Sequence, residues 1–118
     1  MMFFRTLFWL LLASLPATAG APVIESVRAV QANGGWTFHV TLRHADTGWD
    51  HYADGWGVYT QDGEELGYRV LLHPHVDEQP FTRSLSNVVV PGGMDTVVIR
   101  PRDSVHGVGA AFTVELPD

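Results

Sequence analysis

The sequence predicts an all-β protein, a seven-stranded antiparallel β-sandwich, and three observations support this prediction. After residue 20, Gly and Pro recur about every ten residues, and no segment shows the 3.6-residue periodicity of an amphipathic helix. Apolar and polar residues alternate in several short segments instead. Seven such segments in about a hundred residues are typical of two packed antiparallel sheets.

The first nineteen residues have the composition of a cleaved secretory signal peptide. Arg5 precedes an apolar run over residues 7–15, and Ala-Thr-Ala at residues 17–19 has the small-x-small form that signal peptidase recognises. The run is shorter than the roughly 20 residues of a membrane-spanning helix, which favours cleavage over an uncleaved anchor. We therefore expect a signal peptide over 1–19 and a single mature domain over 20–118, periplasmic or secreted.

The composition of the mature chain argues against several classes of function. Thirteen acidic residues stand against six arginines once Arg5 is removed, a net charge of −7, which opposes binding to nucleic acid or anionic lipid. Because the chain contains no cysteine, we expect no disulfide and no lipid-modified N-terminus, hence a soluble mature protein without membrane insertion. No motif of an enzyme is evident, and a metallohydrolase would need an open coordination position with a base such as Glu78 beside it.

The first three strands are expected at residues 22–31, 36–44 and 56–60. Asn-Gly-Gly at 33–35 is a strong turn signal between the first two. The second strand alternates best, with four apolar side chains on one face: Trp36, Phe38, Val40 and Leu42. A loop rich in Asp, Gly and aromatic residues follows over 45–55.

Four more strands complete the predicted sandwich. Gln-Asp-Gly at 61–63 turns the chain into a fourth strand whose inner face is marked by Leu66, Tyr68, Val70 and Leu72. The fifth strand is expected at 81–90, with a bulge near Ser86-Asn87 where the alternation slips by a residue. After the turn at Pro-Gly-Gly, the last strands are expected at 96–100 and 111–116, separated by a loop over 101–109.

This pattern resembles immunoglobulin-like and fibronectin type III domains over the whole mature chain. Trp56 stands on the third strand, where such domains often place a core tryptophan. The chain departs from the superfamily in lacking the cysteine pair and the tyrosine corner of the sixth strand. The resemblance implies a two-sheet sandwich and no particular function.

Five of the six histidines fall in segments that should meet at one end of the sandwich. Successive antiparallel strands place alternate connections at opposite ends, so the loops 45–55, 73–80 and 101–109 share one end, away from the tight turns. Histidines and carboxylates accompany one another there: His44 and His51 with Asp46, Asp50 and Asp54, His73 and His75 with Asp77 and Glu78, and His106 with Asp103. Imidazole and carboxylate are ligands of divalent metal ions, so this end is a candidate metal site.

The predicted ligands are drawn from five histidines: His73, His75, His106, His51 and His44. His73-Pro74-His75 is the sharpest local feature, because residues two apart in an extended chain point to the same side. Without thiolate, the donors suit Cu(II) or Zn(II). The alternative for each histidine is an ordinary structural role, such as capping a strand end or bonding to the backbone.

The predicted function is therefore a small exported protein that binds copper(II) or zinc(II) and is not an enzyme. The alternative is a non-catalytic protein–protein interaction module that binds another exported protein through the same loops. The aromatic residues Trp49, Tyr52 and Trp56 flank the first loop and would plug the end of the sandwich or contact a partner.

Overall fold

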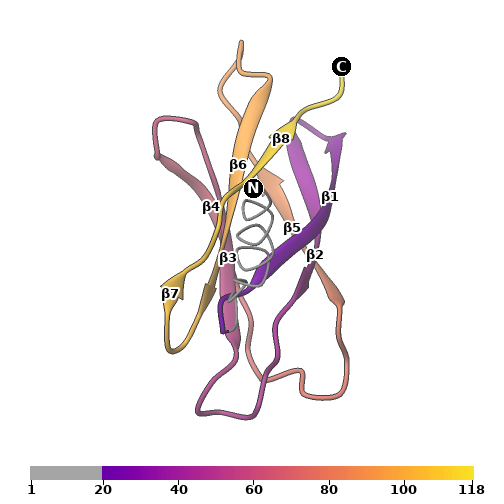
Figure 1. Ribbon diagram of the computed structural model, residues 1–118. Helices are drawn as coiled ribbons and strands as arrows, with labels where there is room; N and C mark the ends of the chain where they lie inside the picture. The colour runs from indigo at the N-terminus through magenta and orange to yellow at the C-terminus, as the bar shows by residue number, and fades with distance from the viewer. Residues whose placement is uncertain (1–19) are drawn as a thin grey trace, which may run out of the picture.

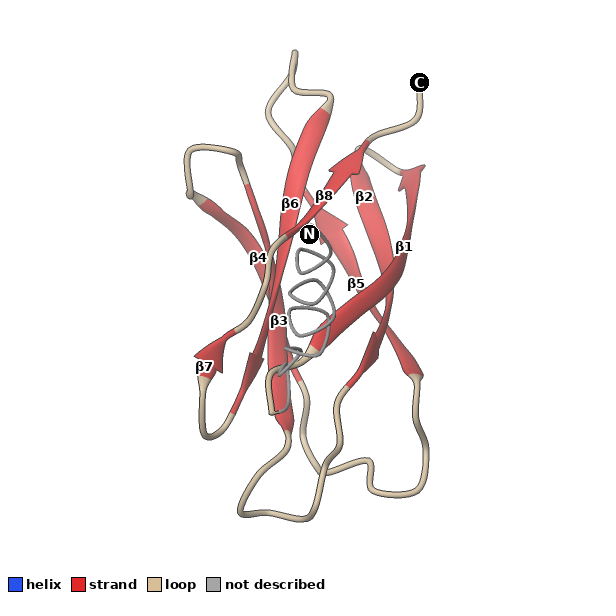
Figure 2. Ribbon diagram, in the orientation of Figure 1, coloured by secondary structure: helices blue, strands red, loops and turns tan. Residues whose placement is uncertain are grey.

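The computed structural model describes residues 20–118, and within this range the chain is all-β, with two antiparallel sheets and no helix (Figures 1 and 2). The predicted signal peptide lies outside the described residues. The strands are β1 (Val23–Ala32), β2 (Gly35–Arg43), β3 (Ala53–Tyr59), β4 (Glu65–Val70), β5 (Phe81–Val88), β6 (Thr96–Asp103), β7 (Gly107–Val108) and β8 (Phe112–Glu115). No helix of residues 20–118 is long and apolar enough to cross a lipid bilayer.

One sheet has the strand order β1-β2-β5, and the other has the order β4-β3-β6, with β7 and β8 both paired to the far edge of β6. The prediction of seven strands is wrong by one within the described residues. The predicted loop over 101–109 is partly a hairpin, because β6 continues through Pro101 to Asp103 and β7 returns beside it. Pro101 is paired with Trp56 of β3, which extends β6 beyond its predicted end at Arg100.

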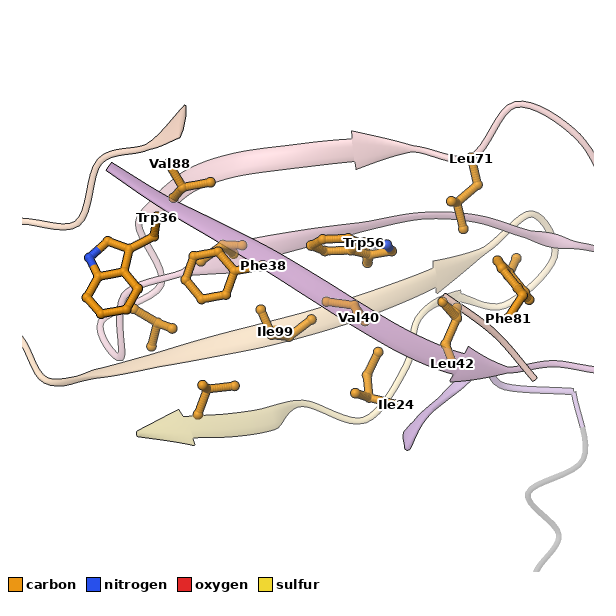
Figure 3. Packing of buried hydrophobic residues seen from close by; sticks show 14 residues of the cluster. Ile24, Trp36, Phe38, Val40, Leu42, Trp56, Leu71, Phe81, Val88 and Ile99 are labelled. Carbon is orange, nitrogen blue, oxygen red and sulfur yellow. The ribbon is translucent and has the colours of Figure 1, made fainter. Parts of the chain in front are cut away.

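The apolar face of β2 forms the centre of the core, as its alternation predicts. Phe38, Val40 and Leu42 have no exposed surface, and Figure 3 shows them with Ile99 of β6 and Trp56 of β3 in one apolar cluster. Burying such side chains supplies most of the favourable free energy of folding. The prediction that Trp56 is a core residue is confirmed.

The predicted inner face of the fourth strand is wrong from Tyr68 onward. Gly67, not Tyr68, pairs with the buried Val58, and Tyr68 lies over Gly55 on the outer face of β3. Val70 and Leu72 are 55% and 75% exposed, whereas Leu71 between them is 2% exposed. A register shift between Val58 and Tyr59 moves the alternation by one residue, so Leu71, whose amide donates a hydrogen bond to the carbonyl of Asp54, takes the inward position. The predicted bulge on the fifth strand is confirmed by a register shift opposite β2 and by φ of +60° at Asn87.

The three polar loops meet at one end of the sandwich, at the bottom of Figure 1, as predicted from strand direction. Hydrogen bonds join them: the amide of Ser104 donates to the carbonyl of Tyr52, and the amide of His75 donates to the carboxylate of Asp46. The tight turns lie at the opposite end. The convergence of the loops therefore places histidines from distant parts of the sequence close together.

Candidate metal centre

Asp103, the last residue of β6, lies at the centre of three imidazole rings and is fully buried. Its Oδ2 is 3.0 Å from each of three nitrogens, His44 Nε2, His51 Nε2 and His106 Nδ1. Its Oδ1 accepts hydrogen bonds from the backbone amides of Val105, at 3.0 Å, and of His106. We call these four side chains, of His44, His51, Asp103 and His106, the Asp103 site.

The register of the strands explains why these residues meet. Alternate residues of a strand face the same side, so Asp103 continues the buried face of Ile99 and Pro101. Ala53, at the start of β3, pairs with Asp103, which brings the loop that carries His51 beside the carboxylate. His44 is the first residue after β2 and continues the inward phase of that strand.

A second buried carboxylate, that of Asp46, holds His44 from the other side. His44 Nδ1 donates to Asp46 Oδ1 at 2.5 Å, and the same oxygen accepts the amide of Ala53 at 3.0 Å. Asp46 Oδ2 accepts the amide of His75 at 2.7 Å, so this carboxylate also ties two loops together. A carboxylate on the far nitrogen of a histidine orients the ring and increases its basicity, as is common for metal-binding histidines.

Gly20 contributes a backbone oxygen that sequence reasoning did not anticipate. Its carbonyl oxygen lies 2.8 Å from His44 Nε2 and 3.3 Å from His51 Nε2. Val23 pairs with Arg43, so the residues before β1 run beside His44. The predicted strand directions could have placed Gly20 near the histidines, because β1 must start at the end of the sandwich opposite its turn with β2.

The pKa values of the two buried ionisable groups, His44 and Asp103, shift in opposite directions on folding. Burial by itself would lower the pKa of His44, but hydrogen bonds to Asp46, Gly20 and Asp103 outweigh it, and the pKa is raised above 6.5. Burial would raise the pKa of Asp103, yet hydrogen bonds from His106 and His51 hold it well below the usual value. Asp103 is thus a carboxylate across the ordinary pH range, and His44 has acceptors on both nitrogens and readily carries a proton.

The geometry fits a small divalent ion in place of that proton. One ligand atom each from His44, His51 and Asp103 can be chosen so that all lie within 4.8 Å of one another. Two ligands bound tetrahedrally at 2.0–2.1 Å stand about 3.3 Å apart, close to the observed nitrogen-to-oxygen separations of 3.0 Å. His106 Nδ1 and the carbonyl of Gly20 are further donors at the same place.

The imidazole rings of the other predicted pair, His73 and His75, lie together but form no hydrogen bond with the Asp103 site, and only the backbone amide of His75 reaches its surroundings, through Asp46. Their ring centroids are 4.6 Å apart, so the spacing did place both rings on one side. The His75 ring stacks on Phe81 at 3.9 Å, and its Nε2 accepts a hydrogen bond from Arg83 at 2.9 Å. Burial, and then the positive charge of Arg83, lower the pKa of His75, which favours a neutral ring in a structural role.

The aromatic residues of the first loop separate in the structure. Trp56 belongs to the core, whereas Trp49 is 67% exposed and its ring lies edge-on to Tyr52 with centroids 5.5 Å apart. Trp49 therefore does not plug the end of the sandwich.

These pKa shifts predict a maximum in the stability of the metal-free protein near pH 6.5. The pKa of His44 is raised on folding, so its contribution is complete below 6.5 and is lost as the pH rises through the folded value. The pKa of His75 is lowered on folding, so the unfolded chain binds more protons just below 6.5 and stability falls as the medium becomes acidic. Urea unfolding from pH 5 to 9 measures the free energy of unfolding on both the acidic and the alkaline limb of this pH dependence. In His44→Gln the decline above pH 6.5 should flatten while the acidic limb persists, and an unchanged alkaline limb would contradict the assignment to His44.

Fold and site together define an all-β protein with a candidate divalent-metal centre built from loop histidines and a buried aspartate. The chain is 49% identical over 77 residues to a protein of Halomicrobium mukohataei described as "Putative lipoprotein". The match covers 65% of this chain and 37% of the relative, so the chain spans little more than a third of the relative's length. No family model and no solved structure matches the chain.

Proposed function

We propose that this protein is a small exported metal-binding protein that holds Zn(II) or Cu(II) at the Asp103 site. The observation that carries the proposal is the single buried carboxylate oxygen with three imidazole nitrogens at 3.0 Å. Donors of nitrogen and oxygen without thiolate suit these two ions. The proposed role is binding, not catalysis.

Two further observations support an exported location and a loop-bearing scaffold for this function. The relative described as a lipoprotein supports export, in agreement with the leader-like composition of residues 1–19. The pairing of β2 with β5, of β3 with β6 and of β6 with β8 supports the resemblance to immunoglobulin-like domains. Such domains present loops from a rigid scaffold, which suits a site assembled from three loops.

Thermal unfolding with and without metal tests the proposal. Chelator-treated protein should unfold at a higher temperature with one equivalent of Zn(II) or Cu(II), because an ion that binds only the folded state stabilises it. The gain is about 2.7 kcal/mol when the free ion is a hundredfold above its dissociation constant. The double variant His51→Ala/His106→Ala removes two partly exposed ligands and should abolish the shift.

The matched control is the double variant His39→Ala/His73→Ala, which removes two histidines outside the site. His39 bonds to Ser84 on the surface of the sheet, and His73 is exposed. The control should keep the full metal-dependent shift. The proposal fails if neither ion raises the unfolding temperature of the wild type. It also fails if the control variant loses this metal-dependent rise as completely as the test variant does.

The alternative function, a protein-interaction module, is supported by apolar side chains on the same loops. Five of them are more than half exposed: Trp49, Leu72, Val76, Val105 and Val108. Exposed apolar side chains that gather near one place favour contact with a partner protein. This function predicts no metal-dependent shift, so the same titration separates the two.

A further inference from the structure

Gly20 is packed directly against the Asp103 site. Besides the contacts of its carbonyl oxygen with His44 and His51, its α-carbon lies against the ring of His106. A Cβ built on Gly20 would stand 2.5 Å from Cε1 of that ring, closer than side chains tolerate. A side chain at this position would displace the His106 ring, and φ of +94° at Gly20 also favours glycine, which lets the main chain approach the ligands closely.

The position of Gly20 is fixed by the domain that follows it. Val23 pairs with Arg43 at the start of β1, and Pro22 is fully buried. The carbonyl oxygen of Pro22 is so close to Gly109 that a Cβ there would stand 2.9 Å away. These contacts hold the residues just before β1 at the site through the folded domain itself.

The predicted cleavage bond is the peptide between Ala19 and Gly20. Hydrolysis by signal peptidase adds one water: the leader leaves with the carboxyl group on Ala19, and Gly20 gains a free α-amino group. Before cleavage the nitrogen of Gly20 is an amide, whose lone pair is delocalised into the carbonyl and is a poor ligand. After cleavage it is an amine, a ligand of the same class as imidazole.

We propose that processing completes the metal site, with the α-amino nitrogen and carbonyl oxygen of Gly20 binding the ion held by His44, His51 and Asp103. The nitrogen and oxygen of one residue are three bonds apart and close a five-membered ring with a metal ion. The inference rests on the proposed function and adds a way in which metal binding is regulated. The precursor has an incomplete site, and the mature protein acquires its full metal affinity only after export. Metal loading is thereby confined to the compartment that the mature chain reaches.

The absence of lysine makes a clean test available. All seven basic residues are arginine, so after processing the only primary amine of the chain is its N-terminal α-amino group. The full-length chain is expressed in a host that exports it, and mass spectrometry of the exported protein identifies its first residue. Part of the sample is then acetylated with an amine-selective reagent. Cu(II) alone is titrated into both forms, and electron paramagnetic resonance counts the bound nitrogens.

The exported protein should begin at Gly20, and acetylation should weaken Cu(II) binding about tenfold or more, since even outer partners of metal ligands cost 10–100-fold when lost. The acetylated form should show one fewer nitrogen ligand and an unchanged unfolding temperature without metal. A first residue other than Gly20, or equal affinity and equal nitrogen count in both forms, overturns this inference while the proposed function stands. Absence of Cu(II) binding in both forms, together with no Zn(II)-dependent shift of the unfolding temperature of the exported protein, overturns the proposed function itself.

Discussion

Asp103→Ala is expected to destabilise the metal-free protein by about 3–5 kcal/mol, the range for removing one partner of a buried ionic network. The carboxylate is fully buried and is the shared acceptor for three imidazoles and two backbone amides. Without this carboxylate, protonated His44 still has Asp46 as a hydrogen-bond acceptor but loses Asp103 as its second negatively charged partner. Urea unfolding at pH 6.5 measures the loss, and metal-dependent stabilisation should disappear in the same variant.

Two matched variants separate the charge of Asp103 from its hydrogen bonds. Asp103→Asn keeps an oxygen that can accept the amides of Val105 and His106, so it should cost less than Asp103→Ala while still losing the ion. Asp77→Ala removes an exposed carboxylate of a neighbouring loop and should change stability by no more than about 0.5 kcal/mol. Wild-type stability in Asp103→Ala would show that the carboxylate does not organise this end of the sandwich.

The fold could be predicted where burial is one-sided. Phe38, Val40 and Leu42 lie on a strand paired on both sides, and a slip of one residue would expose all of them, so the sequence pattern defines the register. β4 lies at the edge of its sheet and buries little, so its alternation carries less information, and the predicted inner face is wrong from Tyr68 onward. The two-residue strand β7 arises from the turn after Asp103 and has no apolar pattern of its own.

The candidate site could be predicted only in part, for a comparable reason. Strand directions were enough to bring His44, His51 and His106 to one end of the sandwich. Local spacing did not decide which histidines share a carboxylate, because the ring of His75 is held by Phe81 and Arg83, two partners several residues further along. The selection depends on tertiary packing, which a two-residue motif does not encode.

The carboxylates illustrate the same limit. Asp103 and Asp46 were only two among several acids near the histidines, and nothing in their local sequence distinguishes them from Asp77. Both are buried in the structure because a strand register and a loop bring them behind the histidine rings. A buried carboxylate needs compensating partners, so finding these two buried among imidazoles is more informative than finding them near histidines in the sequence.

Phe38→Ala tests the core independently of the site and is expected to cost about 3–5 kcal/mol. Phe38 is 0% exposed and lies on the central strand of its sheet, where Ala29 and Leu85 are its paired neighbours. The lost transfer free energy and the cavity left in a closely packed interior both add to the cost. Urea unfolding of the metal-free variant measures it.

The control for Phe38→Ala is Thr37→Ala, the next residue on the same strand with its side chain on the opposite face. Its hydroxyl donates a single exposed hydrogen bond to Ser86, so the loss should stay below about 1.5 kcal/mol. Equal losses in both variants would contradict the assignment of the two faces of β2. Since Phe38 touches no residue of the Asp103 site through any hydrogen bond or ring contact in residues 20–118, Phe38→Ala should retain the metal-dependent stabilisation that Asp103→Ala loses. Phe38→Ala should lower the stability of the metal-free protein but keep the metal-dependent stabilisation, whereas Asp103→Ala should lose that stabilisation. This pair of results would show that folding of the core and metal binding at the loops are separable properties of this chain.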